Sequence, residues 1–263
     1  MEEKKKFKLV TSKKTRYLLP NILTLGGVCL GISSIKFSIE GNYSLAVIFI
    51  AVAAILDALD GRIARLLKGT SEFGKELDSL TDFVSFGIAP ILILYFWELN
   101  NYGKLGWAIT LIYSVCCVLR LARFNLTKID KTEVWKNNYF EGIPSPAGGL
   151  LILTPLFFEL SNIEIYFDIK FIVPYFTVLI AFLLVSKIPT LSFKKISISP
   201  KTTVFILLGI GTTFICLLFY TFKTLFIFCL VYLISIPISF FIYKSQNKKQ
   251  LSETSEDEHE DVL

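Results

Sequence analysis

Apolar residues run along this chain in long blocks, and charged residues fall mainly between the blocks. The pattern predicts eight membrane-spanning helices, because about 20 consecutive apolar residues match the thickness of a bilayer. The spans are expected at 17–38, 43–66, 77–97, 105–123, 145–161, 168–187, 203–220 and 224–243. The predicted fold class is therefore all-α, a polytopic transmembrane helical bundle.

Lysine and arginine residues indicate how these spans are oriented. Most of the 27 Lys and Arg residues lie in alternate connections, together with the N-terminal segment. Cytoplasmic loops carry an excess of such residues, so these segments are assigned to the inside. Both termini are then cytoplasmic, which requires an even number of spans.

The composition supports a membrane protein and divides the chain into three parts. Hydrophobic residues make up 53% of the chain and charged residues only 19%, whereas soluble domains carry about 25% charged residues. An ordinary soluble enzyme and a disordered protein are thereby excluded. We expect a basic cytoplasmic segment at 1–16 that faces anionic lipid, a membrane domain at 17–243, and an acidic disordered tail at 244–263. No nucleic-acid partner is expected.

Four aspartates stand where a membrane helix should be apolar. Asp57 and Asp60 close the second span, and Asp78 and Asp82 open the third. A charge at such a depth costs roughly 2.5–3.5 kcal/mol, so it usually has a function. Each pair follows helical spacing, so each lies on one helix face. A hairpin with a cytoplasmic turn brings the two faces together.

Small residues share these faces and leave room for a ligand. Gly61 and Ala64 follow the first aspartate pair, and Gly74 precedes the second. Without side-chain bulk, the backbone can be approached closely. Arg62 and Arg65 could hold phosphate oxygens beside them.

Clustered carboxylates repel one another and need cations. The sole histidine, His259, lies in the acidic tail, so the ligands available are oxygens, which suit Mg²⁺, Mn²⁺ or Ca²⁺. Two ions would balance four negative charges, and paired ions serve phosphoryl transfer. The alternative is a purely structural hairpin in which pairs such as Asp57–Arg65 neutralise the charge.

The aspartates and their neighbours form one fixed pattern, Asp57-x2-Asp60-Gly61-x2-Ala64-Arg65-x8-Gly74-x3-Asp78-x3-Asp82. The pattern resembles the signature of the CDP-alcohol phosphatidyltransferase family. This resemblance implies an integral membrane enzyme that displaces CMP from a CDP-lipid with an alcohol and a divalent metal, Mg²⁺ or Mn²⁺, as one or two ions.

The resemblance also implies roles for the individual positions. Asp57, Asp60 and Asp78 correspond to metal ligands, and Asp82 corresponds to a metal ligand that is also the general base. A further set corresponds to positions that contact the CDP-lipid: Gly61, Ala64 and Gly74 beside the nucleotide, and Arg65 beside the diphosphate.

Three other stretches narrow the resemblance to one branch. Residues 20–24, Pro-Asn-Ile-Leu-Thr, resemble the family's entry motif, in which Asn21 and Thr24 approach the nucleotide; a polar helix start is the alternative interpretation. Residues 120–125 and 140–148 resemble those of the bacterial phosphatidylserine synthases. That branch implies CDP-diacylglycerol as donor, L-serine as acceptor, a homodimer, and a bacterial inner membrane with the active site facing the cytoplasm.

Arg120 and Arg123 lie at the inner end of the fourth span. A cation there could bind the acceptor's carboxylate or a lipid phosphate, although positive-inside topology alone would also place arginines at this point. Other interpretations of the chain stay open. They are the same chemistry with glycerol 3-phosphate or inositol, a transporter coupled to cations or protons, and a membrane-anchored scaffold.

Overall fold

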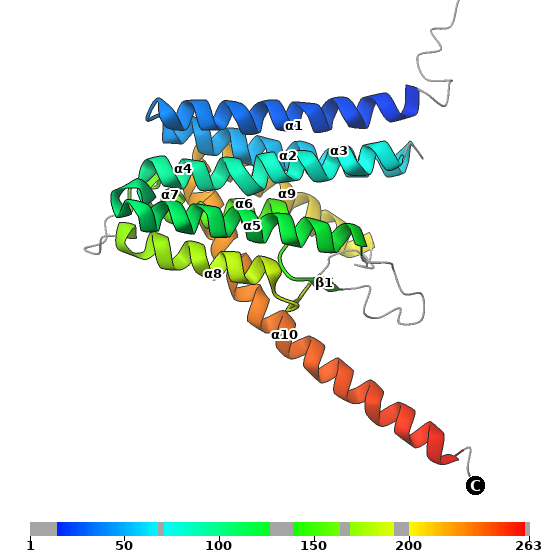
Figure 1. The fold of residues 1–263 in the computed structure, drawn as a ribbon. Helices are drawn as coiled ribbons and strands as arrows, with labels where there is room; N and C mark the ends of the chain where they lie inside the picture. Colours follow the sequence, from blue (N-terminus) through cyan, green and yellow to red (C-terminus); the bar gives the residue numbers. More distant parts are fainter. Residues whose placement is uncertain (1–14, 68–70, 127–138, 164–168, 192–199, 261–263) are drawn as a thin grey trace, which may run out of the picture.

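The computed structural model describes residues 15–67, 71–126, 139–163, 169–191 and 200–260, and these form helices with one two-stranded ribbon (Figure 1). Five helical stretches are long and apolar enough to cross a membrane: Leu18–Ile39, Tyr43–Leu66, Glu72–Trp97, Lys104–Leu126 and Thr221–Ser245. Two shorter apolar helices lie at Ile169–Val185 and Phe205–Phe219. The expected all-α membrane bundle is confirmed.

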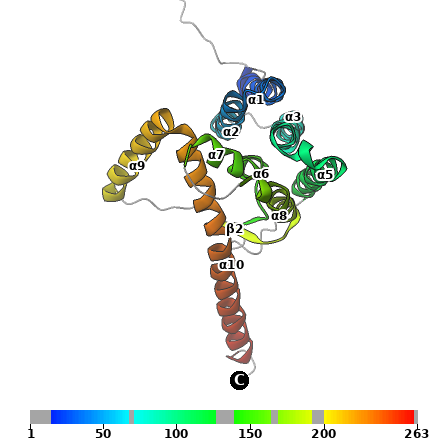
Figure 2. The same ribbon diagram turned by 90° about the vertical axis from the view of Figure 1, so that its left-hand side faces the viewer.

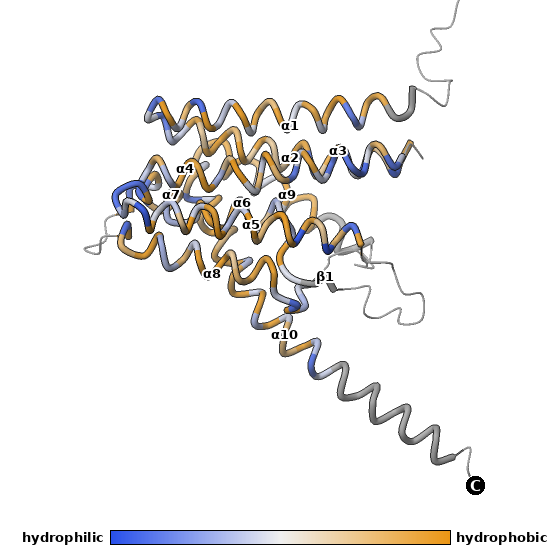
Figure 3. The backbone as a smooth tube through the Cα atoms, viewed as in Figure 1, coloured by the Kyte–Doolittle hydropathy of each residue, from blue (hydrophilic) through white to orange (hydrophobic). Residues whose placement is uncertain are grey.

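The elements follow the chain in this order: α1 (Thr15–Ile39), α2 (Tyr43–Leu66), α3 (Glu72–Asp82), the π-helix η1 (Phe83–Ile88), α4 (Ala89–Trp97), the 3₁₀ turn η2 (Leu99–Tyr102), α5 (Lys104–Leu126), β1 (Tyr139–Glu141), α6 (Ser145–Ile152), α7 (Thr154–Leu160), the 3₁₀ turn η4 (Ile169–Ile172), α8 (Val173–Val185), β2 (Pro189–Leu191), α9 (Pro200–Phe219) and α10 (Thr221–Glu260). Hydrophobic residues cover most of α1, α2, α5 and α8, while α3 is largely hydrophilic (Figure 3).

Helices α1 and α2 form a tight antiparallel hairpin. Gly41, with a φ of +76°, closes the turn between them, a conformation that glycine adopts without strain. The side chain of Asn42 then accepts a hydrogen bond from the amide of Leu45 at 3.2 Å and caps α2. At the opposite end, Ser71 caps α3 by accepting the amide of Gly74 at 3.0 Å. These two caps fix where the aspartate-bearing helices begin.

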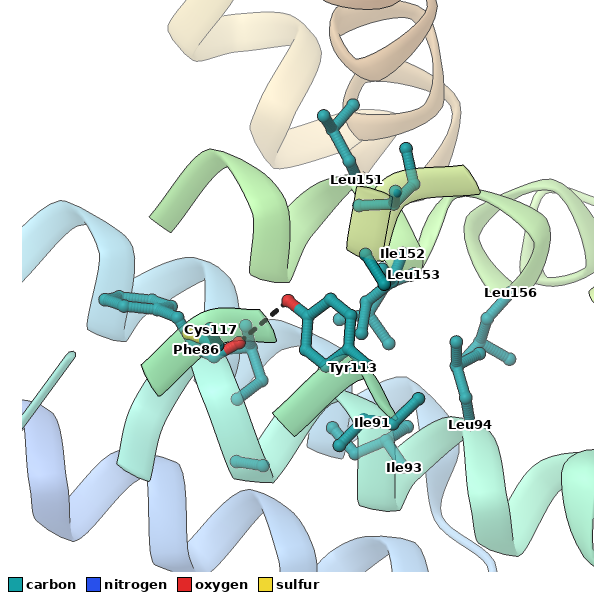
Figure 4. Packing of buried hydrophobic residues seen from close by; sticks show 14 of the residues in the cluster. Phe86, Ile91, Ile93, Leu94, Tyr113, Cys117, Leu151, Ile152, Leu153 and Leu156 are labelled. Atoms are coloured by element: carbon teal, nitrogen blue, oxygen red, sulfur yellow. Dashed lines mark hydrogen bonds between the residues drawn. The ribbon is translucent and has the colours of Figure 1, made fainter. Parts of the chain in front are cut away.

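The third span changes its winding midway, just after Asp82. The turn at η1 is a π-helix, and Pro90 in the following turn has no amide to donate to the carbonyl of Phe86. The hydroxyl of Tyr113 on α5 donates to that carbonyl instead, at 3.0 Å (Figure 4). A buried carbonyl is thus satisfied by a neighbouring helix, and α5 is tied to the third span.

The expected fifth span, 145–161, is broken into α6 and α7. Pro155 cannot donate to the carbonyl of Leu151, and the hydroxyl of Thr154 bonds that carbonyl at 2.6 Å. Both short helices are deeply buried, and Leu151, Ile152 and Leu156 pack into the core around Tyr113 (Figure 4). This segment lies inside the bundle, and each of its two helices is shorter than the five helices that are long enough to cross a membrane.

A small β-ribbon crosses the end of the bundle near the aspartates. Strands β1 and β2 are antiparallel, with Phe140 opposite Thr190. The hydroxyl of Ser239 on α10 donates to the carbonyl of Pro189 at 2.8 Å. The ribbon therefore links the connection before α6 to the last long helix.

The last two helices differ from the rest. Helix α9 stands away from the other helices and meets the start of α10 (Figure 2), and none of the side chains described in Phe205–Phe219 is buried. Helix α10 continues to Glu260 and projects from the bundle (Figure 1), where the sequence predicted a disordered tail from 244. Extending a formed helix needs no new nucleus, and the Lys, Gln and Glu residues here favour helix. The basic segment 1–16 lies outside the described residues except for its last two.

Candidate active site

Three of the four aspartates converge as their spacing predicted. Carboxylate oxygens of Asp57 and Asp60 on α2 and of Asp78 on α3 all lie within 4.8 Å of one another. Asp82, one turn further along α3, faces Asp57 across the two helices. The α2–α3 hairpin therefore gathers four acidic side chains at one end of the bundle.

In the part of the chain that the structure describes, no cationic side chain forms an ion pair with these aspartates. Among the described residues, the ion pairs are Lys36–Glu40 at 3.5 Å and Lys75–Glu72 at 2.7 Å, both on helix surfaces. The alternative structural hairpin, with an Asp57–Arg65 pair, is not found in this part of the chain, and Arg65 is exposed. Any negative charge on these neighbouring carboxylates would therefore favour a bound cation.

The geometry fits a divalent cation. The Oδ1 atom of Asp82 is buried and meets no hydrogen-bond donor, and an ionised oxygen in that position is costly to leave unpaired. Oxygens bound to one Mg²⁺ or Ca²⁺ lie up to about 4–5 Å apart, twice the metal–oxygen distance. The carboxylates of Asp57, Asp60 and Asp78 meet this condition, and the all-oxygen donor set suits a hard ion.

Helix α1 supports the aspartates from the other side. The hydroxyl of Thr24 lies 2.6 Å from Oδ2 of Asp60 and 3.0 Å from the carbonyl of Pro20. Thr24 is buried, so the entry motif reaches the site by holding an aspartate. The side chain of Asn21 lies beside Gly74, where an added Cβ would be 3.4 Å from its Oδ1. Both predicted nucleotide-contact residues of α1 thus face the α2–α3 hairpin.

A narrow cleft lies between these helices. Its walls come from α1, α2 and the third span, and they include Thr24, Asp57, Asp60, Thr81 and Ser85. The small residues expected beside the nucleotide also fit an open site. A Cβ added at Gly61 would meet nothing within 4 Å, and Gly61 is exposed while Ala64 is half-buried.

Asp82 is held by a residue that the sequence did not single out. The hydroxyl of Ser145, at the start of α6, donates to Oδ2 of Asp82 at 2.6 Å. Arg120 in turn donates from Nη1 to Ser145 Oγ at 2.6 Å and from Nε to the carbonyl of Ile143 at 2.8 Å. Ser145 lies within the stretch 140–148 that resembles the bacterial phosphatidylserine synthases, but nothing in that stretch alone assigns a role to its serine.

The two arginines expected at the acceptor differ in their contacts. Arg123 donates to the carbonyls of Val185 at 2.8 Å and Ser186 at 3.1 Å, and so caps the end of α8. The hydrogen bonds of Arg120 use two of its five N–H donors. Arg120 therefore lies next to Asp82, and Arg123 lies at the neighbouring helix end.

Comparison with known proteins places this site in a family. The family model for CDP-alcohol phosphatidyltransferases matches residues 17–185, which include every helix that lines the cleft. The chain belongs to the CDP-alcohol phosphatidyltransferase family. Enzymes of this family generally use a divalent metal, in agreement with the carboxylate group in α2 and α3.

Several curated relatives of the family bear one name, CDP-diacylglycerol–serine O-phosphatidyltransferase. The protein of that name from Mycobacterium tuberculosis (strain H37Rv) is 38% identical over 185 residues, 70% of this chain and 64% of the relative. The one from Helicobacter pylori (strain 26695) is 34% identical, over 76% of this chain and 82% of the relative. The one from Bacillus subtilis (strain 168) is also 34% identical, over 67% of this chain and 92% of the relative. The match spans less than two thirds of the mycobacterial relative's length.

Proposed function

We propose that this chain transfers the phosphatidyl group of CDP-diacylglycerol to the hydroxyl of L-serine, giving phosphatidylserine and CMP. The observation that carries the proposal is the convergence of Asp57, Asp60 and Asp78, with Asp82 nearby, on two helices that the family model covers. The choice of acceptor is supported by the shared name of the relatives from Mycobacterium, Helicobacter and Bacillus.

The site residues have separate roles in binding the metal and the CDP-lipid. Asp57, Asp60 and Asp78, with Asp82, would hold Mg²⁺ or Mn²⁺, and a bound cation would neutralise the diphosphate. The open surface at Gly61 and the neighbouring Ala64 and Gly74 receive the cytidine nucleotide, with Arg65 beside the diphosphate. Asn21 and Thr24 support that surface from α1, and Thr24 does so through Asp60.

The transfer itself is an in-line displacement at the β-phosphorus. The serine hydroxyl oxygen forms a bond to this phosphorus while the bond to the CMP oxygen breaks, and CMP leaves with the electron pair. Asp82 accepts the hydroxyl proton as general base. The N–H donors of Arg120 that face no protein acceptor would hold the serine carboxylate, while Arg123 adds positive charge beside it.

Topology, location and assembly complete the proposal. Eight spans with both termini in the cytoplasm place the aspartate end at the inner face of a bacterial cytoplasmic membrane, where serine is available. Topology reporters fused after residue 69 and after residue 101 should then report opposite sides. A homodimer is proposed on the family resemblance, and the mass of the detergent-solubilised protein by light scattering would test it.

The decisive assay supplies CDP-diacylglycerol and Mg²⁺ or Mn²⁺ to the purified protein. CMP release is then measured with L-serine, glycerol 3-phosphate, myo-inositol or no acceptor. We expect release with serine alone and phosphatidylserine as the lipid product. Release only with another acceptor would retain the aspartate chemistry and overturn the acceptor assignment. No release from folded protein under any condition would overturn the transferase proposal and favour a cation transporter.

A further inference from the structure

Ser145 occupies a position that no site assignment above explains. Its side chain is fully buried, although a serine has little apolar surface to gain from burial. It begins α6, yet its hydroxyl makes no hydrogen bond within that helix. The hydroxyl instead reaches Asp82, 63 residues earlier in the chain, at 2.6 Å.

The direction of each hydrogen bond in this group is fixed by chemistry. A guanidinium can only donate, so Ser145 Oγ accepts from Arg120 Nη1. The single hydroxyl proton of Ser145 is then directed at Oδ2 of Asp82. The Nε bond from Arg120 to the carbonyl of Ile143 holds the turn that carries the serine. Arginine, serine and aspartate thus form an ordered chain of donors that ends on one carboxylate oxygen.

The two carboxylate oxygens of Asp82 differ in their hydrogen-bond partners. Oδ2 accepts the Ser145 hydroxyl, whereas Oδ1 is buried and accepts no hydrogen bond from a described N–H or hydroxyl group. A carboxylate that was free to rotate would exchange these oxygens. With Ser145 in place, the oxygen left without a donor is always Oδ1. This removes one rotational degree of freedom from the group that must meet the reacting hydroxyl, which is how positioning lowers a barrier.

We propose that Ser145 is a positioning residue for the transfer reaction, and that it acts with Arg120 to present Oδ1 of Asp82 to the acceptor hydroxyl or a bound cation. The inference rests on the proposed function, because it assigns Asp82 a direct part in the reaction. In this role Ser145 acts through Asp82 and not on a substrate. Supporting groups of this kind around functional carboxylates typically change activity by about 10- to 100-fold when they are removed.

The test compares Ser145→Ala with Ser145→Thr in the serine-dependent CMP-release assay. We expect Ser145→Ala to lower kcat about 10- to 100-fold with the KM for CDP-diacylglycerol within about twofold of wild type. Ser145→Thr keeps the hydroxyl and should restore most of kcat. Ser161→Ala is the matched control, because that buried serine caps the end of α7 and its hydroxyl donates only to the carbonyl of Phe158 in that helix; its kinetics should match wild type.

The outcomes separate this inference from the proposed function. Wild-type protein that releases no CMP with serine would defeat the proposed function before any variant is compared. Active wild type with an unchanged kcat in Ser145→Ala would defeat the positioning role alone. A structural role would appear as a lower thermal midpoint with no rescue of kcat by threonine, and this result would also overturn the inference.

Discussion

Apart from the hydrophilic α3, helices α1–α8 are rich in apolar residues, as is helix α9, yet the two regions meet their surroundings in different ways. In α1–α8, serine, threonine and tyrosine hydroxyls cross from one helix to another, as Ser85 does to the carbonyl of Gly27 at 3.1 Å. In α9 the hydroxyl of Thr212 turns back to its own helix, to the carbonyl of Leu208 at 3.0 Å. The first region therefore has hydroxyls that bond between helices as well as hydroxyls that bond within one, whereas Thr212 of α9 bonds only within its own helix.

Glycines show the same contrast. A Cβ added at Gly31 on α1 would lie 2.9 Å from the hydroxyl and 3.0 Å from the backbone of Ser85, whereas Gly209 and Gly211 on α9 have open space. In membranes, small residues allow close backbone approach at helix interfaces. The comparison teaches that hydropathy identifies a membrane helix, while the partners of its small and polar residues show whether it packs on protein. Matched substitutions in the two regions test this distinction.

The largest effect is expected from substituting Asp82, the polar residue of the first region that takes part in the proposed reaction. Asp82→Asn should lower serine-dependent CMP release about 10²- to 10⁴-fold, because the general base is lost. The protein should stay folded, since one charge is removed from a group of repelling carboxylates. CMP release and the thermal midpoint in detergent are the measurements. Activity near wild type would show that the region's chemistry does not depend on this carboxylate.

A smaller effect is expected from the support that α1 gives to α2. Thr24→Val keeps the shape of the side chain and removes the hydroxyl that lies 2.6 Å from Asp60. The Mn²⁺ concentration needed for half-maximal CMP release should rise about 10- to 100-fold, as for other groups that orient metal ligands. Thr212→Val on α9 is the matched control, because its hydroxyl bonds only within its own helix. An equal rise in this Mn²⁺ concentration for both variants would contradict the proposed difference between the two regions.

The sequence predicted most of what the first region contains, for identifiable reasons. Asp57, Asp60 and Asp78 converge because helical spacing and a hairpin place them there, and both are visible in a single chain segment. Thr24 was also found, but as a nucleotide contact, since nothing in the spacing of α1 indicates a bond to Asp60. The long apolar helices of this region were likewise readable, because each follows from local composition.

The features that the sequence did not predict depend on contacts between distant segments. The bond from Ser145 to Asp82 spans 63 residues, and the fixed turn before α6 gave no sign of which helix it would meet. The break between α6 and α7 was readable in principle, since Pro155 removes an amide inside a predicted span. The exposure of α9 could not be read, because a helix facing lipid and a helix facing protein have similar hydropathy.

Stability should respond differently to one added methyl group in the two regions. Gly31→Ala forces the Cβ against the backbone of Ser85, so we expect a loss of about 1–3 kcal/mol and a lower thermal midpoint in detergent. Gly211→Ala on α9 meets open space and should raise helix stability by up to about 1 kcal/mol, as Ala replaces Gly in a helix. A drop of similar size in both variants would show that α9 packs against protein as tightly as α1 does.

The smallest effect concerns the hydroxyl that bridges α5 and the third span. Tyr113→Phe removes the 3.0 Å bond to the carbonyl of Phe86, and Pro90 has no amide to replace it. Hydrogen bonds between membrane helices contribute about 0.6 kcal/mol on average, so the thermal midpoint should fall only slightly. Tyr220→Phe, at the exposed turn between α9 and α10, should leave the midpoint unchanged. Because η1 directly follows Asp82, a fall in CMP release larger than the fall in stability would show that this bond also holds the catalytic turn. A fall in both variants alike would show instead that the tyrosine hydroxyl matters equally in the two regions, contrary to the comparison.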